Sequence, residues 1–487
     1  MANKNSDRNK ILGGFVWKFA ERSSSQGVTF LISVILARLL MPQEYGLVAM
    51  INIFIVFANV FVTSGFTASL IQKKDADELD FSTIFYCTLT MSVLMYGIIY
   101  LCAPAIAAFY NMPDLVILTR VYSLSLILTS YQTIQQAYVS RHMLFKKTFV
   151  STFCGNIISG IIGIVLAYSG LGVWALIGQY ISNILINMFT LMYIIPWKPQ
   201  MIFSLARAKG LMSYGSKILM SQLVSVTYKE LSQLIIGKMY TPADLGLYNR
   251  GSHLPKLVNT NMDITIRSVL FPAMSNHSDN PERVKQLLRR GIRTSSYLAF
   301  FFLTLLATAS EPIVKILLTD KWIESVPYMQ IFCIYYMFLV ISGYNVQAVK
   351  AIGKSNEVLK LEVFKKPLFL IVVFLAAQHS IMAVALVSPL NALYAMAMNM
   401  GPSRRCLGYS FKEQMSDLQA SSLLALAVFV ATWPFTLLNM NEFLVMFLQL
   451  IVGFMVFIGL SKIFKVDSYI YVKTTLVDFH NRTKNRK

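Results

Sequence analysis

The chain has 487 residues, of which 56% are hydrophobic and only 14% are charged, and its mean hydropathy is +0.58. Soluble domains carry about 45–50% apolar and about 25% charged residues, so this composition excludes a soluble protein and indicates a polytopic membrane protein. The formal net charge is +20. Because the basic residues recur in alternate loops, this charge predicts membrane orientation rather than a nucleic-acid partner.

Apolar stretches long enough to cross a bilayer follow one another along nearly the whole chain. They predict an all-α polytopic membrane protein with about 14 transmembrane helices. The predicted spans lie near residues 12–40, 46–71, 81–109, 114–139, 148–168, 171–195, 211–239, 245–271, 294–318, 326–349, 362–378, 380–401, 418–438 and 443–464. The sequence contains neither a phosphate-binding loop nor a metal-ligand spacing, so we predict no metal and no bound cofactor.

Basic residues are concentrated in the N-terminal segment, in every second loop and in the C-terminal tail. The loop residues are Lys73, Lys74, Arg141, Lys146, Lys147, Lys198, Arg207, Lys209, Arg283, Lys285, Arg289, Arg290, Arg293, Lys350, Lys354, Lys360, Lys365, Lys366, Arg404, Arg405 and Lys412. The intervening loops contribute essentially only Lys321. Since cytoplasmic loops carry the excess of Lys and Arg, we predict that both termini are cytoplasmic and that the number of spans is even.

A short pattern recurs 200 residues later and indicates an internal repeat. Pro42, Glu44, Gly46 and Leu47 correspond to Pro242, Asp244, Gly246 and Leu247. We predict a six-helix N-terminal lobe at 1–200, a six-helix C-terminal lobe at 201–412, an additional helix pair at 413–465 and a basic cytoplasmic tail at 466–487. Because six is even, the two lobes have the same orientation, as in transporters built from parallel repeats around a central cavity.

The predicted span 245–271 carries polar side chains along one face. They are Arg250, His253, Lys256, Thr260, Asp263 and Arg267. Their spacings of three or four residues place them on or near one side of a helix. Ionisable groups at membrane depth face a bundle interior or a wet cavity, so this face is predicted to line a substrate path. The alternative is a helix outside the bilayer, which would reverse the charge bias of every later loop.

The first helix of each half is also polar along one face, and we predict that both faces line the same cavity. The predicted substrate-binding cations of this cavity are Arg22, Lys217, Lys229, Arg250, Lys256 and Arg267. They outnumber the carboxylates Glu21, Glu230 and Asp263, so the cavity favours an anion, and arginine in particular binds phosphate. Candidates for coupling transport to a proton or cation gradient are Glu21, Glu230, His253 and Asp263. We predict no catalytic residue.

Three segments resemble a known family. Pro42-Gln43-Glu44-Tyr45-Gly46-Leu47, Gly65-Phe66 leading to Leu70-Ile71-Gln72, and Leu245-Gly246-Leu247-Tyr248-Asn249-Arg250 are similar to the polysaccharide transporter branch of the multidrug/oligosaccharidyl-lipid/polysaccharide exporter superfamily, which includes Wzx-type and colanic-acid-exporter-like flippases. The resemblance implies about 14 spans in a 6 + 6 + 2 plan. It also implies an inner-membrane flippase, which moves an undecaprenyl-diphosphate-linked oligosaccharide repeat unit to the outer leaflet for O-antigen, capsule or exopolysaccharide synthesis. It assigns no residue roles.

Two other functions remain open at this point. A drug or metabolite exporter of the same superfamily would usually handle cations, which a net-positive face disfavours. A membrane-embedded polysaccharide polymerase or ligase generally needs a substantial external loop, whereas the predicted outer loops are short. We therefore predict a transporter working by alternating access rather than an enzyme. Its partners would be the lipid-linked oligosaccharide, membrane lipids and other proteins of the pathway, a polymerase among them.

Overall fold

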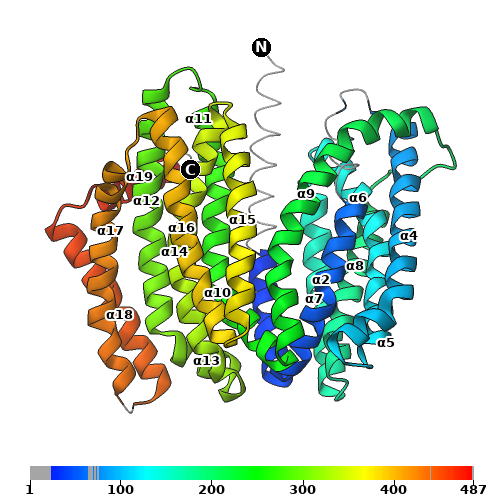
Figure 1. The fold of residues 1–487 in the computed structure, drawn as a ribbon, viewed down its shortest axis with the longest axis horizontal. Coiled ribbons are helices and arrows are strands. Elements are labelled where there is room, and N and C mark those ends of the chain that lie inside the picture. The colour runs from blue at the N-terminus through cyan, green and yellow to red at the C-terminus, as the bar shows by residue number, and fades with distance from the viewer. Residues whose placement is uncertain (1–23, 64–69, 71–72, 74–75, 439, 485–487) are drawn as a thin grey trace. The chain divides into compact units, whose positions relative to one another are not determined.

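The computed structural model describes residues 24–438, except for 64–69, 71–72 and 74–75, and residues 440–484 (Figure 1). Within these residues the chain is helical throughout, with no β-strand. This confirms the predicted all-α class. The chain divides into two compact units, Met1–Gly246 and Leu247–Lys487.

The first unit contains a helix at Ser24–Leu39 and eight labelled helices, the last of which only begins there. These are α2 (Pro42–Thr63), α4 (Glu78–Tyr110), α5 (Leu115–Ser123), α6 (Ser125–Arg141), α7 (Phe145–Tyr168), α8 (Val173–Ile194), α9 (Leu205–Met239) and the start of α10 (Pro242–Thr265). Although residues 205–239 belong to the second lobe by sequence repeat, α9 packs against α2 and α4 of the first unit.

The second unit takes in the rest of α10 and the remaining helices. These are η1 (Ile266–Leu270), α11 (Phe271–Ser275), α12 (Pro281–Thr308), α13 (Ser310–Leu318), η2 (Asp320–Ser325), α14 (Val326–Ala351), α15 (Ser355–Ala377), α16 (Ile381–Leu407), α17 (Phe411–Thr432), η3 (Trp433–Leu437), α18 (Glu442–Ile463) and α19 (Asp467–Lys484).

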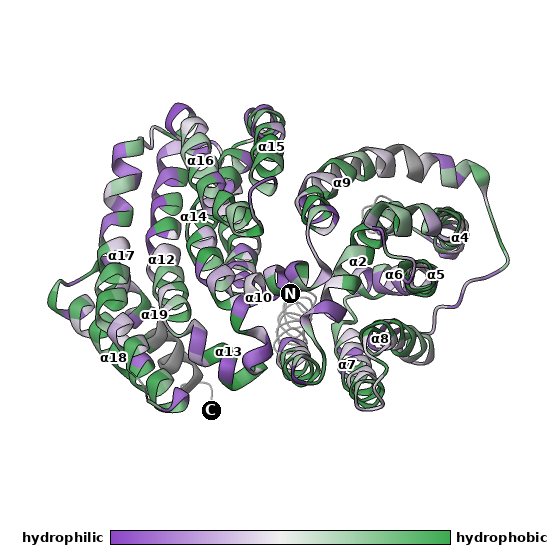
Figure 2. Cartoon of the chain, turned by 60° about the horizontal axis from the view of Figure 1, so that its bottom comes forward, coloured by the Kyte–Doolittle hydropathy of each residue, from purple (hydrophilic) through white to green (hydrophobic). Residues whose placement is uncertain are grey.

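Ten helical segments among the described residues are long and apolar enough to cross a membrane. They are α2, α4, α5–α6, α7, α8, α12, η2–α14, α16, α17–η3 and α18. Figure 2 shows hydrophobic residues along most of α4, α5 and α18. The helix Ser24–Leu39 is apolar but shorter, and α9, α10 and α15 contain polar and charged residues that lower their hydropathy. The crossing of these four, and so the total of 14, remains a prediction.

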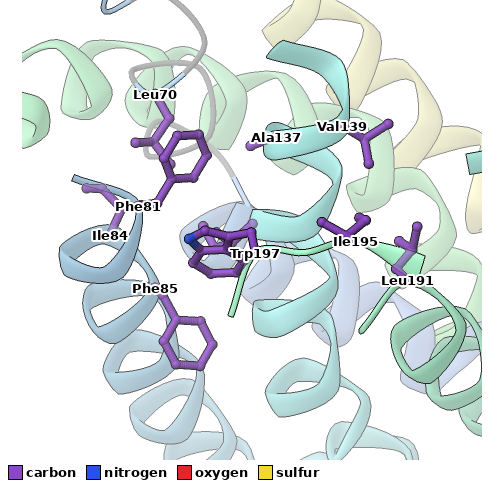
Figure 3. Close-up of a cluster of buried hydrophobic side chains, with 10 residues drawn as sticks. Leu70, Phe81, Ile84, Phe85, Ala137, Val139, Leu191, Ile195 and Trp197 are labelled. Atoms are coloured by element: carbon purple, nitrogen blue, oxygen red, sulfur yellow. The ribbon is translucent and has the colours of Figure 1, made fainter. Parts of the chain in front are cut away.

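A tryptophan in the connection after α8 anchors the core of the first unit (Figure 3). The Trp197 ring lies 6.0 Å from that of Phe81 and 6.4 Å from that of Phe85, both on α4. Ile195 and Leu191 join the same buried cluster. Because Trp197 is only 5% exposed, the start of the connection to α9 is fixed against α4 by burial of aromatic surface.

Polar contacts hold the rest of this connection on the N-terminus of α4. The Gln200 backbone N–H donates to Ser82 Oγ at 3.1 Å, and that of Ser204 donates to Thr83 Oγ1 at 3.2 Å. Arg207, in the first turn of α9, pairs with Asp77 at 2.6 Å. A hydrogen bond from the backbone N–H of Asp80, and the Arg207 guanidinium, lower the pKa of Asp77. The connection is therefore tied down by hydrogen bonds and by the ion pairs of Arg207 with Asp77 and, at 3.2 Å, with Asp80.

Neutral polar side chains join α7 and α8. Ser151 Oγ donates to Asn187 Oδ1 at 2.9 Å, and Asn183 Nδ2 donates to Asn156 Oδ1 at 2.9 Å and to Ser159 Oγ at 3.1 Å. Both serines and Asn187 are buried. Since buried polar groups need partners, this amide–hydroxyl ladder fixes the register of the two helices.

In the second unit a buried carboxylate joins α17 to α12. Asp417 of α17 accepts hydrogen bonds from Arg289 at 2.7 Å and Arg293 at 2.5 Å, both on α12. The Tyr409 hydroxyl donates to the same carboxylate at 2.6 Å. Because the Asp417 side chain is fully buried, these charge-assisted bonds compensate for its lost hydration and attach α17 to α12.

The starts of α2 and α10 pack against each other through their glycines. A Cβ on Gly46 would lie 1.6 Å from the Pro242 carbonyl oxygen, and one on Gly246 would lie 2.1 Å from that of Pro42. All four residues belong to the first unit. The two copies of the repeated Pro-x-x-x-Gly pattern thus meet reciprocally, each glycine facing the other copy's proline.

Candidate functional site

Five of the six stripe residues predicted from the sequence lie on α10. They are Arg250, His253, Lys256, Thr260 and Asp263. Lys256 is exposed and the other four are partly buried. Thr260 Oγ1 donates to the Lys256 carbonyl oxygen at 2.8 Å, so its hydroxyl is satisfied within the helix. The structure therefore places the predicted charged face on one regular helix.

The sixth residue lies beyond the regular helix. Residues Ile266–Leu270 form a π-helical turn between α10 and α11, so the predicted uninterrupted α-helix over 245–271 is wrong at this point. Pro272, which has no N–H, cannot bond back to the Ser268 carbonyl and favours a wider turn. Arg267 falls in this turn, and its side chain lies outside the described residues.

The opposite side of α10 is apolar and closely packed on α14. The Tyr248 ring lies 5.9 Å from that of Tyr328 and 5.1 Å from that of Phe332. A Cβ on Gly251 would lie 2.6 Å from the Tyr328 Cβ, and Pro255 is buried. Because this packing fixes the rotation of α10, the charged stripe points away from α14.

Arg250 is positioned at the boundary between the packed and the charged sides. Its guanidinium carbon lies 5.6 Å from the centroid of the Trp322 ring, in η2. Trp322 is fully buried, so the aromatic partner is rigid. A cation over an indole face is stabilised by the ring quadrupole, and it keeps a planar donor fork suited to phosphate oxygens.

The predicted residues on α9 lie in the first unit. Glu230 is 6% exposed and accepts a hydrogen bond from Gln233 Nε2 at 2.9 Å. The Lys229 ammonium lies 3.7 Å from the same carboxylate, and its side chain is 66% exposed. Glu230 is thus a buried carboxylate with one neutral donor and one nearby cation, while Lys229 faces outward.

The other predicted site residues cannot be placed. Glu21 and Arg22 lie outside the described residues, and so does the side chain of Lys217. The described members fall into two groups, with Lys229 and Glu230 in the first unit and the α10 stripe in the second. Each unit therefore carries its own set of predicted site residues. Among the described residues, no three His, Cys, Asp or Glu side chains are arranged to hold a metal.

A charged cluster inside the second unit was not predicted from the sequence. Lys365 was expected in a basic loop, but it lies on α15 and is 5% exposed. Lys365 Nζ donates to Glu362 Oε1 and to Asn399 Oδ1, each at 2.8 Å. Asn399 Nδ2 in turn donates to Ser342 Oγ at 2.7 Å, and Lys366 lies 3.5 Å from Glu362. The cluster joins α14, α15 and α16.

One signal for this cluster is present in the sequence. Glu362 precedes Lys365 by three residues and Lys366 by four, the spacing at which helical side chains pair. The same two lysines also fit the pattern of basic loops, which hides this pairing. Asn399 carries no such signal, because it lies 34 residues from Lys365 and only the packing of α16 on α15 brings it close.

Residues 35–327 match the family model described as Polysaccharide biosynthesis protein. The chain is 22% identical over 311 residues to the succinoglycan biosynthesis transport protein ExoT of Rhizobium meliloti (strain 1021), which covers 64% of this chain and 63% of that protein. It is 24% identical over 309 residues to the teichuronic acid biosynthesis protein TuaB of Bacillus subtilis (strain 168), covering 62% and 63%. The chain thus spans slightly less than two thirds of the length of these two relatives.

A third relative aligns over most of both chains. The lipopolysaccharide biosynthesis protein WzxC of Escherichia coli (strain K12) is 20% identical over 436 residues, covering 88% of this chain and 87% of that protein.

Two solved structures share the fold. The lipid II flippase MurJ, in an inward closed conformation, matches with a TM-score of 0.76 and 14% identity, covering 92% of this chain and 98% of that chain. An inward-facing multidrug resistance transporter of the MATE family matches with a TM-score of 0.60 and 13% identity, covering 80% and 98%. At such identities the likeness concerns the fold. The family model matches more than half of this chain, so the chain belongs to the family of polysaccharide biosynthesis proteins.

Proposed function

We propose that this protein is a flippase for a lipid-linked oligosaccharide. It is a multi-pass membrane transporter of the polysaccharide biosynthesis family and not an enzyme. The proposed substrate is an undecaprenyl-diphosphate-linked repeat unit, moved from the cytoplasmic to the outer leaflet of the inner membrane. The proposal includes 14 spans, cytoplasmic termini and alternating access by two six-helix lobes.

The observation that carries this proposal is the two-sided character of α10. One side packs on α14 through Tyr248 and Gly251, and the other carries Arg250 and Lys256. A helix of this kind inside a membrane protein needs an aqueous or polar surface for its charged side. A diphosphate bearing a sugar supplies the anion that such cations would bind.

The two cations have different roles in this proposal. Arg250 is fixed by its ring contact with Trp322 and would bind phosphate oxygens through a planar fork. Lys256 is exposed and would act as a point charge farther along the path. Arg22, Lys217, Lys229 and Arg267 remain part of the proposed cationic path, and Glu21, Glu230, His253 and Asp263 remain the proposed coupling groups.

The test is export in a strain whose surface polysaccharide depends on this gene. We expect Arg250→Ala to reduce export about 10- to 100-fold, because a charge-assisted hydrogen bond contributes about 1.5–3 kcal/mol. Arg250→Lys should keep partial activity. Lys354→Ala, which removes an exposed cation outside the stripe, is the matched control and should export normally.

Two measurements complete this experiment. Membrane abundance of each variant separates loss of transport from loss of protein, and the lipid-linked intermediate should accumulate inside cells carrying Arg250→Ala. Normal export by the double variant Arg250→Ala/Lys256→Ala at normal abundance would show that these cations do not bind the substrate.

A further inference from the structure

A short turn separates α18 from α19. Among the ten candidate spans α18 has the highest hydropathy, and it ends at Ile463. Ile463 and Phe464 are each 71% exposed, and Lys462 and Lys465 beside them are exposed too. Lys465 has a φ of 48°, and α19 begins two residues later. An apolar corner flanked by lysines therefore lies at the end of a candidate membrane span.

Three contacts with α12 set the orientation of α19. Arg293 pairs with Asp467 at 3.2 Å, and Ser468 Oγ donates to the Arg293 carbonyl oxygen at 3.2 Å. The Arg290 guanidinium lies 3.7 Å from the centroid of the Tyr471 ring. Because Asp467, Ser468 and Tyr471 lie on one side of the helix, its opposite side is turned away from α12.

That opposite side mixes apolar and basic side chains. Ile470 is 48% exposed, Val477 is 49% exposed, and Lys473 between them is exposed. We call Lys462, Phe464, Lys465, Ile470, Lys473 and Val477 the α19 surface. The only acidic residue from Lys462 to Val477 is Asp467, which pairs with Arg293. The α19 surface is therefore apolar and positively charged, and the exposed carboxylate beside it, Asp467, is paired with Arg293.

We propose that the α19 surface lies on the membrane and binds the headgroups of anionic phospholipids. Its apolar residues would enter the boundary between headgroups and acyl chains, as in helices that lie in the plane of the interface. Its lysines would bind the lipid phosphates, as basic segments next to membrane spans do. The position directly after α18 favours a lipid surface over a protein partner, because the end of a membrane span is already at the interface.

The experiment compares lipid binding in nanodiscs of phosphatidylcholine with and without phosphatidylglycerol. The wild-type protein should unfold at a higher temperature with phosphatidylglycerol, because a ligand of the folded state stabilises it. The triple variant Lys462→Gln/Lys465→Gln/Lys473→Gln should lose most of this difference. The matched control Lys350→Gln/Lys354→Gln/Lys412→Gln removes three exposed cations elsewhere in the second unit and should keep it.

Native mass spectrometry of the folded fraction gives an independent reading. We expect phosphatidylglycerol retention to fall about fivefold for each lysine removed, and to fall likewise in high salt, which screens surface charge. Phe464→Ser/Ile470→Ser should also lower retention although it changes no charge. Equal unfolding temperatures of the wild-type protein in both lipids, or equal losses in the two triple variants, would overturn the proposal. So would retention that depends on a co-purifying protein.

Discussion

Helices α2 and α10 begin alike and then differ along their whole length. Each starts with proline and has glycine four residues later, and the two starts pack reciprocally. In α2 the residues 200 positions before the charged stripe include Met50, Ile53 and Val60, which are apolar and at most 5% exposed. The repeat therefore determines where these helices begin, whereas the chemistry of their faces is independent in each half.

The helix pairs α7–α8 and α15–α16 differ in the same way. In the first unit Ser151 of α7 donates to Asn187 of α8. In the second, Lys365 of α15 donates to Asn399 of α16 at nearly the same distance. A hydroxyl in one half is thus matched by an ammonium group in the other. Both comparisons place the additional charge in the second half.

The largest loss of folded protein is expected from changes at the two glycines through which the starts of α2 and α10 pack. Gly46→Ala would place a Cβ 1.6 Å from the Pro242 carbonyl oxygen, and Gly246→Ala would place one 2.1 Å from that of Pro42. Backbone atoms cannot move aside cheaply, so each variant should lose most of its folded protein in the membrane. Gly97→Ala, where a Cβ meets nothing within 4 Å, is the control. Normal abundance of both variants would contradict the reciprocal packing.

A smaller loss of stability should distinguish the charged cluster around Lys365 from the neutral contacts between α7 and α8. Lys365→Met leaves Glu362 with only Lys366 and leaves Asn399 Oδ1 without its donor. We expect a loss of about 2–3 kcal/mol, below the about 3–5 kcal/mol for a wholly buried pair, because Glu362 is partly exposed.

Ser151→Ala is the matched change in the first unit, and it should cost about 1 kcal/mol as the loss of a neutral hydrogen bond. Thermal unfolding in detergent measures both variants. A Ser151→Ala loss as large as that of Lys365→Met would mean that charge does not distinguish the two clusters.

The smallest effect is on the pH dependence of stability, through Asp77, which holds the connection to α9. The folded-state pKa of Asp77 lies below its ordinary value, so its contribution to stability is present above the unfolded pKa of about 3.9 and is lost as pH falls through the folded value. Asp77→Asn should cost less than about 1 kcal/mol at pH 7, since the carboxylate is half exposed.

Unfolding midpoints of Asp77→Asn and wild type should therefore converge as pH falls below about 4. Asp114→Asn is the control, because Asp114 forms no ion pair with another described residue. A difference that persisted unchanged at pH 3 would mean that the Asp77 charge is not what stabilises the connection.

The sequence predicted the all-α class and the charged side of α10 because both depend on local spacing. The spacing of Arg250, His253 and Lys256 alone places them on one helical face. The π-helical turn before Pro272 was missed because regular periodicity assumes an unbroken helix. Lys365 was missed for another reason: its partner Asn399 is distant in sequence, and a lysine near predicted loops has the same local pattern whether buried or solvated.

The most direct test of the central claim is transport by the purified protein. In proteoliposomes we would follow transbilayer movement of a fluorescent oligosaccharide on a polyprenyl diphosphate, comparing wild type with Arg250→Ala/Lys256→Ala at matched unfolding temperature. We expect that wild type accelerates the movement and that this acceleration is at least about tenfold smaller in the double variant. Equal rates in the two proteins, or equal wild-type rates for a cationic lipid of the same size, would contradict it.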